Sequence, residues 1–361
     1  MTLRILYAVN CGLPERDYRV IYAASSARCS VTFALPSRPA SVPEERYRRL
    51  GFSEGLGWRD AGNALRLAQL LVRHRRELDV AHFYSTKLLL LGPVLARLAG
   101  VRSVITVTGF GRAMSRTGPA YRVVRVVYLV LFRVAVRLSS AVLFQNTADL
   151  EATAGRLPAA RAKMSYIGSA VAMPVQADKD YAGPLGVLLV ARVMPAKGVD
   201  DFLAAARELA APGLRFVLVG GPSRGCEQLQ REVEAADAAG TISYLGRLEG
   251  EALLAAYRAA HVFCFPSRHE GLARVMIEAG YAGLCPVAYD IPGNRDLVVD
   301  GTGLLLPPGD RSALVRAVRG LAEDRGELVR RAAAYQSHVS RAFGMDTYRA
   351  RMDAVLEGLI A

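Results

Sequence analysis

The chain has 361 residues, of which 52% are hydrophobic and 22% charged, and its formal net charge is +13. This length suits two domains that each bury a core of their own. The composition excludes a disordered or low-complexity protein; no apolar run predicts a transmembrane helix, and the strand-like residues 1–9 lack the cleavage pattern of a signal peptide.

The positive charge is concentrated in the first half of the chain. Residues 1–172 contain 25 Lys and Arg against 10 Asp and Glu, a net +15, whereas residues 173–361 contain 21 against 23, a net −2. This asymmetry predicts an anionic partner for the first half, such as a membrane surface, a lipid phosphate or a nucleic acid. The five cysteines are scattered without a C-x-x-C pair, so neither a disulfide framework nor a zinc site is expected.

The first half alternates apolar runs with helical patterns. Such alternation is typical of a doubly wound parallel sheet. Strands are expected at residues 3–9, 29–35, 79–84, 103–108 and 141–145, and helices at 61–76, 87–98 and 119–139.

Arginines mark the predicted helix 119–139. At roughly 100° per residue its four arginines share one face, the remainder is mostly Val, Leu, Tyr and Phe, and two more arginines precede the helix. The segment is therefore either a basic helix that docks in a membrane interface or a helix that covers the sheet with a charged outer face. The docking candidates are Arg112, Arg116, Arg122, Arg125, Arg133 and Arg137.

A connection rich in Gly, Pro and polar residues separates the halves, and a domain boundary is expected near residue 172. The alternation then restarts. Arg192 follows the first strand of the second half, and Lys197 lies where the next helix opens. Two cations fixed at a helix N-terminus suit an anionic group. After the next strand, Gly220 lets the backbone approach a nucleotide closely.

Two carboxylates eight residues apart, Glu270 and Glu278, dominate the stretch 266–310. Glu270 lies on a turn between an apolar strand and a helical pattern, and Glu278 lies two turns into that helix. The turn's backbone N–H groups suit a phosphate. An ionised Glu278 would accept hydrogen bonds from a vicinal diol such as a ribose, and Glu270 would face the group beyond the phosphate.

These residues resemble the donor-binding half of glycosyltransferase family 4. The family's E-x7-E signature matches Glu270 and Glu278, with Gly271 directly after the first glutamate, and its R-x4-K-G pair matches Arg192 and Lys197. The resemblance implies an α/β fold of the GT-B architecture, in which two Rossmann-like, doubly wound parallel-sheet domains face a central cleft. Residues 1–172 would form the acceptor and membrane-docking domain, 173–342 the donor domain, and 343–361 a terminal helix that crosses back to the first domain.

The family transfers sugar with retention of anomeric configuration from a nucleotide-sugar, most often UDP-linked, and needs no cofactor. No metal site is expected, because the one D-x-D, at 178–180, reads as a solvated linker. The resemblance implies that the departing phosphate oxygen helps take the acceptor proton. The catalytic residues would be Glu270, Arg192 and Lys197. The donor-binding residues would be Glu278, Gly271, Leu272, Ala273, Gly220 and Gly246.

Segments 82–87 and 107–111 are similar to one branch of the family, which adds a hexose or N-acetylhexosamine to an undecaprenyl-diphosphate-linked sugar. This similarity implies an anionic lipid-linked acceptor and a peripheral location at the cytoplasmic face of the cell membrane. His82 would either contact the substrate or pack at a strand end, and Lys87 would either meet acceptor phosphate or be solvated. The acceptor-side candidates are Gly12, His82, Lys87, Thr108 and Gly109.

Three other functions stay open. The acceptor could be a soluble small molecule, and GDP could replace UDP. The same architecture also serves sugar-nucleotide epimerases, although those need carboxylates and histidines that converge on the sugar, and the low histidine content of the first half argues against one. A basic binding module for membranes or nucleic acid is the non-enzymatic alternative; no nucleic acid is expected, because no zinc-finger or helix-turn-helix signature is present.

Overall fold

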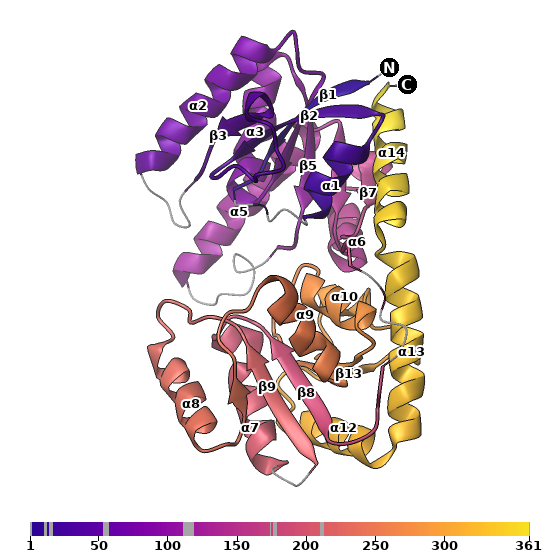
Figure 1. The fold of residues 1–361 in the computed structure, drawn as a ribbon. Coiled ribbons are helices and arrows are strands. Elements are labelled where there is room, and N and C mark those ends of the chain that lie inside the picture. The colour runs from indigo at the N-terminus through magenta and orange to yellow at the C-terminus, as the bar shows by residue number, and fades with distance from the viewer. Residues whose placement is uncertain are drawn as a thin grey trace. The chain divides into compact units, whose positions relative to one another are not determined.

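The structure is a computed structural model, and it describes residues 2–10, 13, 17–52, 58–110, 119–173, 175, 179–209 and 213–360. The chain divides into two compact units (Figure 1). Unit 1 combines Met1–Ala172 with Met345–Ala361, and unit 2 is Met173–Gly344.

Unit 1 contains a seven-stranded parallel sheet in the order β3-β2-β1-β4-β5-β6-β7. Its central strands are mostly apolar and are buried along almost their whole length, as expected where helices cover both faces of a parallel sheet. The strand order reverses between β1 and β4, which places a ligand-binding crevice of such folds at their carboxyl ends. The strands are β1 (Leu3–Ala8), β2 (Cys29–Leu35), β3 (Tyr47–Arg49), β4 (Val80–Tyr84), β5 (Arg102–Val107), β6 (Ala141–Phe144) and β7 (Met164–Tyr166).

Helices cover both faces of this sheet. One core joins the sheet to α1 (Tyr18–Ser25) and to the C-terminal helix α14 (Met345–Ile360), through side chains such as Tyr22 and Tyr348. The other core joins it to the helices of the opposite layer. These are α2 (Trp58–His74), α3 (Thr86–Ala99), α5 (Pro119–Leu138) and α6 (Thr147–Arg156).

Unit 2 contains a six-stranded parallel sheet in the order β10-β9-β8-β11-β12-β13. Here the order reverses between β8 and β11. The strands are β8 (Leu185–Val190), β9 (Leu214–Val219), β10 (Ser243–Tyr244), β11 (Val262–Phe265), β12 (Cys285–Tyr289) and β13 (Leu304–Leu306). The helices are η3 (Pro195–Lys197), α7 (Val199–Glu208), α8 (Glu227–Ala238), α9 (Gly250–Ala259), α10 (Arg274–Tyr281), α11 (Pro292–Arg295), α12 (Arg311–Glu323) and α13 (Arg325–Ala342).

Two segments differ from the expected pattern. The long loop predicted after β2 contains the 3-10 helix η1 (Glu44–Arg46) and the edge strand β3, whose three polar or aromatic residues carry no hydrophobic alternation. The linker at residues 178–180 was expected to be solvated. In the structure, Lys179 Nζ donates to the carbonyl oxygens of Tyr257 and Arg258 at 3.3 and 2.9 Å. Burial lowers the pKa of Lys179 to about 8. Asp178 lies outside the described residues.

None of the helices in the described part of the chain combines the length and apolarity needed to cross a bilayer.

Candidate active site

A cavity of about 320 Å³ opens at the point where the strand order of unit 2 reverses. Arg192 follows β8 and Glu270 follows β11, so the two central strands deliver both residues to the same edge of the sheet. Six of the residues predicted for catalysis or donor binding line this cavity. The lining residues are Val190, Ala191, Arg192, Lys197, Phe265, Glu270, Leu272, Ala273, Arg274, Val275 and Glu278.

The two predicted catalytic side chains Lys197 and Glu270 form an ion pair. Lys197 Nζ lies 2.5 Å from Glu270 Oε1, and 22% and 11% of their side chains are exposed. Ser267 Oγ donates to the same carboxylate oxygen at 2.7 Å. Arg192 is exposed and lines the cavity beside them. The site therefore presents one fixed and one exposed cation to an anionic group.

The N-terminus of α10 borders the same cavity. Its N-cap is Ala273, whose methyl group makes no capping hydrogen bond. A helix start of this kind suits a phosphate, because backbone N–H groups and the helix dipole both favour negative charge. Gly271 and Leu272 lie on the turn that leads into it.

Glu278 lies one turn further into α10. Tyr257 of α9 donates its hydroxyl to Glu278 Oε2 at 2.9 Å. Burial raises the pKa of Glu278, and the hydrogen bond from Tyr257 and the charge of Arg274 offset only part of that rise. The ionised carboxylate is therefore less favourable in the free protein than in water, although a ribose diol would supply it with hydrogen-bond donors.

We expect Glu278→Gln to raise the thermal stability of the free protein at neutral pH and to weaken nucleotide binding. Because the folded-state pKa is raised, ionisation of Glu278 destabilises the fold above that pKa, and neutral glutamine removes this penalty. The stability gain should shrink as the pH falls through the raised pKa, where the wild-type carboxyl is already protonated. Thermal melts across pH, together with calorimetric titration of UDP, test this. The prediction is contradicted if the melting temperature of Glu278→Gln, relative to that of wild type, is lower at neutral pH than at acid pH.

Gly220 and Gly246 are not among the lining residues of the cavity. Gly220 N donates to Gly246 O at 2.7 Å. A methyl group on Gly220 would lie 1.7 Å from the carbonyl oxygen of Ala191, so glycine is required there by the close approach of two backbones. This contact explains Gly220 without a ligand, and a donor-binding role for the two glycines stays a prediction.

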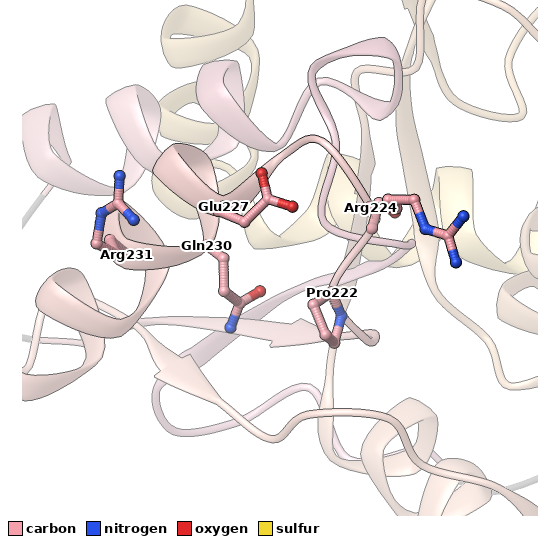
Figure 2. A pocket seen from close by; sticks show the side chains of 6 residues that line it. Pro222, Arg224, Glu227, Gln230 and Arg231 are labelled. Atoms are coloured by element: carbon pink, nitrogen blue, oxygen red, sulfur yellow. The ribbon is translucent and has the colours of Figure 1, made fainter.

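A second pocket, of about 460 Å³, lies in the β9–α8 connection. Figure 2 shows Arg224 and Arg231 at its two ends, with Glu227 and Gln230 between them. The pocket was not predicted from the sequence, because its residues match no motif. It lies one strand away from the cavity at β8 and β11.

The acceptor-side candidate His82 is buried in β4, with 2% of its surface exposed. Its Nε2 lies 2.6 Å from Thr106 Oγ1, and its ring stacks on Tyr84 with the centroids 4.3 Å apart. Burial, followed by the charge of Arg19, lowers the pKa of His82 to about 3, so the ring is neutral. This environment supports the alternative that His82 packs at a strand end, and a contact with the substrate stays a prediction.

Lys87 lies in the first turn of α3 and donates to Asp60 Oδ2 at 2.6 Å. It is therefore ion-paired rather than simply solvated, and a phosphate would compete with Asp60 for it. Thr108 and Gly109 follow β5, where Thr108 is exposed. Gly12 lies outside the described residues.

A pocket that the sequence did not predict lies at the carboxyl ends of β2 and β3. Its volume is about 760 Å³. Two exposed arginines face it, and its described lining contains no carboxylate. The lining residues are Pro36, Arg49, Gly51, Phe52, Gly62, Asn63 and Arg66. Unit 1 therefore offers an anionic ligand a basic pocket at the edge of its sheet.

The predicted docking helix α5 has an exposed face with two sectors. Arg122, Arg133 and Arg137 are exposed, whereas Arg125 is half-buried on the packed side. Arg112 and Arg116 lie outside the described residues. Beside the exposed arginines lies a row of apolar side chains, each 38–65% exposed. This row, the α5 apolar row, comprises Val123, Val124, Val126, Val127, Val130, Leu131 and Val134.

Residues 178–338 match the family described as "Glycosyl transferases group 1". This match supports the predicted glycosyltransferase type at the level of the family and does not distinguish its branches. The chain is 33% identical over 281 residues to 2-deoxystreptamine N-acetyl-D-glucosaminyltransferase of Streptomyces fradiae, covering 72% of this chain and 65% of that protein. It is 36% identical over 134 residues to phosphatidyl-myo-inositol mannosyltransferase of Mycolicibacterium smegmatis, covering 36% of this chain and 34% of that protein. The chain thus spans less than two thirds of the length of either relative.

Solved structures share the whole fold. Sucrose-phosphate synthase from Thermosynechococcus elongatus superposes with a TM-score of 0.80 at 18% identity, covering 99% of both chains. Anabaena HepE in complex with UDP superposes with a TM-score of 0.74 at 19% identity, covering 99% of this chain and 100% of that chain. These likenesses confirm the predicted fold class, two parallel-sheet α/β domains of the GT-B architecture.

Proposed function

We propose that the protein is a retaining glycosyltransferase that uses a nucleotide-sugar, UDP-linked, and transfers a hexose or N-acetylhexosamine. The observation that carries this proposal is the cavity at β8 and β11, where Arg192, Lys197 and Glu270 surround the start of α10. The family match over 178–338 covers all of these residues. The complex of HepE with UDP supports a uridine nucleotide as the donor.

In the proposed reaction the bond between the anomeric carbon and the β-phosphate oxygen breaks, and a bond to the acceptor oxygen forms on the same face of the sugar. The departing phosphate oxygen takes the acceptor proton. Arg192, Lys197 and the N-terminus of α10 stabilise the charge that grows on the diphosphate. Glu270 holds donor hydroxyls and Glu278 holds the ribose.

For the acceptor we propose an anionic lipid-linked sugar, reached from the inner face of the cell membrane. The α5 apolar row supports this proposal. At roughly 100° per residue the buried side chains of α5 fill one side, and the opposite side carries the row together with exposed arginines. Apolar and basic sectors side by side suit the interface of an anionic bilayer. A soluble acceptor is the second candidate, because the Streptomyces fradiae relative is named for 2-deoxystreptamine.

We expect Val127→Asp with Val130→Asp to reduce binding to vesicles that contain anionic lipid by about tenfold or more, because a charged side chain cannot enter the apolar part of the interface. Sedimentation with vesicles measures this. Leu98→Asp is the matched control, since Leu98 is an apolar residue of α3, outside the α5 apolar row, that is 80% exposed. Vesicle binding that is equal in the two variants would exclude the α5 apolar row as the docking surface.

A transfer assay tests the function itself. Labelled UDP- and GDP-sugars are offered with an undecaprenyl-diphosphate-linked monosaccharide in liposomes and, separately, with soluble aminocyclitols. Label in the lipid fraction supports the lipid-linked acceptor, and label only in the soluble product supports the second candidate. An epimerised nucleotide-sugar that keeps its label would indicate an epimerase. No reaction with any sugar nucleotide would reject the proposed function.

A further inference from the structure

The two loops that carry the ion-paired lysine and glutamate, 195–198 and 266–270, touch through their backbones. Arg268 N donates to a carbonyl oxygen of the first loop at 3.0 Å. A methyl group on Gly198 would lie 2.0 Å from the carbonyl oxygen of Pro266, so no side chain fits between the loops. A group that fixes one loop therefore fixes the other.

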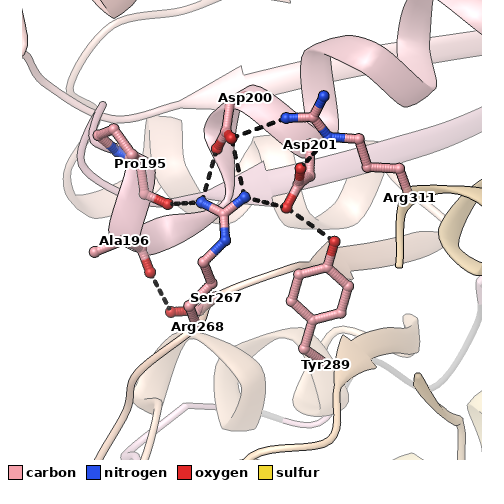
Figure 3. Close-up of polar contacts among 8 residues, drawn as sticks. All are labelled: Pro195, Ala196, Asp200, Asp201, Ser267, Arg268, Tyr289 and Arg311. Atoms are coloured by element: carbon pink, nitrogen blue, oxygen red, sulfur yellow. Dashed lines mark hydrogen bonds and ion pairs between the residues drawn. The ribbon is translucent and has the colours of Figure 1, made fainter. Parts of the chain in front are cut away.

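The side chain of Arg268 crosses from its own loop to the start of α7 (Figure 3). Its Nη1 and Nη2 donate to the two carboxylate oxygens of Asp200 at 3.0 and 2.9 Å, a bidentate contact. Nη2 also donates to Asp201 Oδ2 at 2.5 Å, and Nη1 donates to the carbonyl oxygen of Pro195. One guanidinium thus holds both the helix start and the loop before it.

Asp201 anchors this contact to the sheet. Its carboxylate is 1% exposed and accepts hydrogen bonds from the hydroxyl of Tyr289 at 2.9 Å and from Nε of Arg311. Tyr289 ends β12 and Arg311 begins α12. A buried carboxylate is tolerated only with such partners, so its surroundings have little freedom to shift.

We propose that these residues form a clamp that positions Lys197 and Glu270 for sugar transfer. The proposal rests on the proposed function. The described lining of the cavity includes no member of the clamp, so its members are positioning residues rather than catalytic ones. The clamp consists of Asp200, Asp201, Arg268, Tyr289 and Arg311.

Arg268→Lys tests the clamp, because lysine keeps the charge but cannot reproduce the planar, bidentate contact. We expect kcat to fall by about tenfold or more, with the KM for donor and the dissociation constant of UDP within about threefold of wild type. The matched control is Arg331→Lys. Arg331 also binds a carboxylate and a carbonyl, Glu327 at 2.6 Å and Gly303 at 2.8 Å, and its side chain is 22% exposed against 28% for Arg268. We expect it to leave kcat within about twofold.

Hydrogen exchange read by mass spectrometry reports on the clamp independently of activity. We expect Arg268→Lys to raise exchange in both loops, 195–198 and 266–270, and Arg331→Lys to raise it in neither. If Arg268→Lys does not fold, Tyr289→Phe provides a milder loss within the clamp: it removes only the hydroxyl that donates to Asp201 Oδ2. We then expect a fall in kcat of about threefold or more, again without loss of UDP affinity.

The outcomes separate the clamp from the proposed function. An active wild type with unchanged kcat in Arg268→Lys, or with equal loss in Arg268→Lys and Arg331→Lys, would overturn the clamp alone. A wild type that transfers no sugar would overturn the proposed function, and the catalytic role of the clamp with it. Exchange that rises in only one loop would show that the loops are not held together.

Discussion

Replacement of Glu270 by alanine is expected to lower kcat for sugar transfer by about 10²- to 10³-fold and to change the dissociation constant of UDP by less than about threefold. Glu270 lines the cavity and holds Lys197 Nζ at 2.5 Å. Its loss removes the proposed contact to the donor sugar and leaves Lys197 without its carboxylate. The nucleotide would keep Arg192, Glu278 and the start of α10. Steady-state kinetics and calorimetric titration of UDP measure the two quantities.

Glu278→Ala is the crossover control for this prediction. It should weaken UDP binding itself, because Glu278 is assigned to the ribose. The double variant of Glu270→Ala and Lys197→Ala should lose less activity than the product of the two single losses, because the residues act as one ion pair. Equal losses of kcat and UDP affinity in Glu270→Ala and Glu278→Ala would contradict the assigned roles.

Much of the candidate site could be predicted from the sequence, because its parts are local. A strand, a turn and a helix follow one another within 262–281, and the spacing of Glu270 and Glu278 places both at one strand end. Arg192 and Lys197 are likewise fixed by one strand and the turn after it. The parallel sheet then brings the two segments together, since the carboxyl ends of neighbouring strands share an edge.

The partners of these residues could not be predicted, because they come from distant parts of the chain. Tyr257 reaches Glu278 across 21 positions, and Arg268 reaches Asp201 across 67. Which of many polar side chains pairs with a given one depends on tertiary packing. No sequence period encodes it.

In helix α5, too, tertiary packing decides a feature that the sequence could not predict. Its periodicity places the arginines on one face, but the packed side is decided by α3 and the sheet beneath it. Arg125 falls between Phe132 and Val136 on that packed side, where its long apolar stem can lie. The sequence left open whether this helix docks in a membrane interface or covers the sheet with a charged outer face. The α5 apolar row is exposed, because the helix has more apolar residues than one buried face can hold.

Gly198→Ala is expected to destabilise the protein by about 3 kcal/mol, a large share of the stability of an ordinary domain. Gly198 has φ +69°, which residues other than glycine rarely adopt. In addition, the new methyl group would lie 2.0 Å from the backbone carbonyl of Pro266, which cannot rotate away as a flexible side chain would. Urea denaturation measures the change.

Gly240→Ala separates the two causes. Gly240 has φ +70°, nearly the same as Gly198, but a methyl group there would meet no atom within 4 Å. We expect this control to lose only about 1 kcal/mol, the contribution of the backbone conformation alone. The remaining loss in Gly198→Ala then measures the contact between loops 195–198 and 266–270. Equal losses in the two variants would mean that the loops separate freely, and the ion pair of Lys197 and Glu270 would then lack the backbone contact that holds its two sides together.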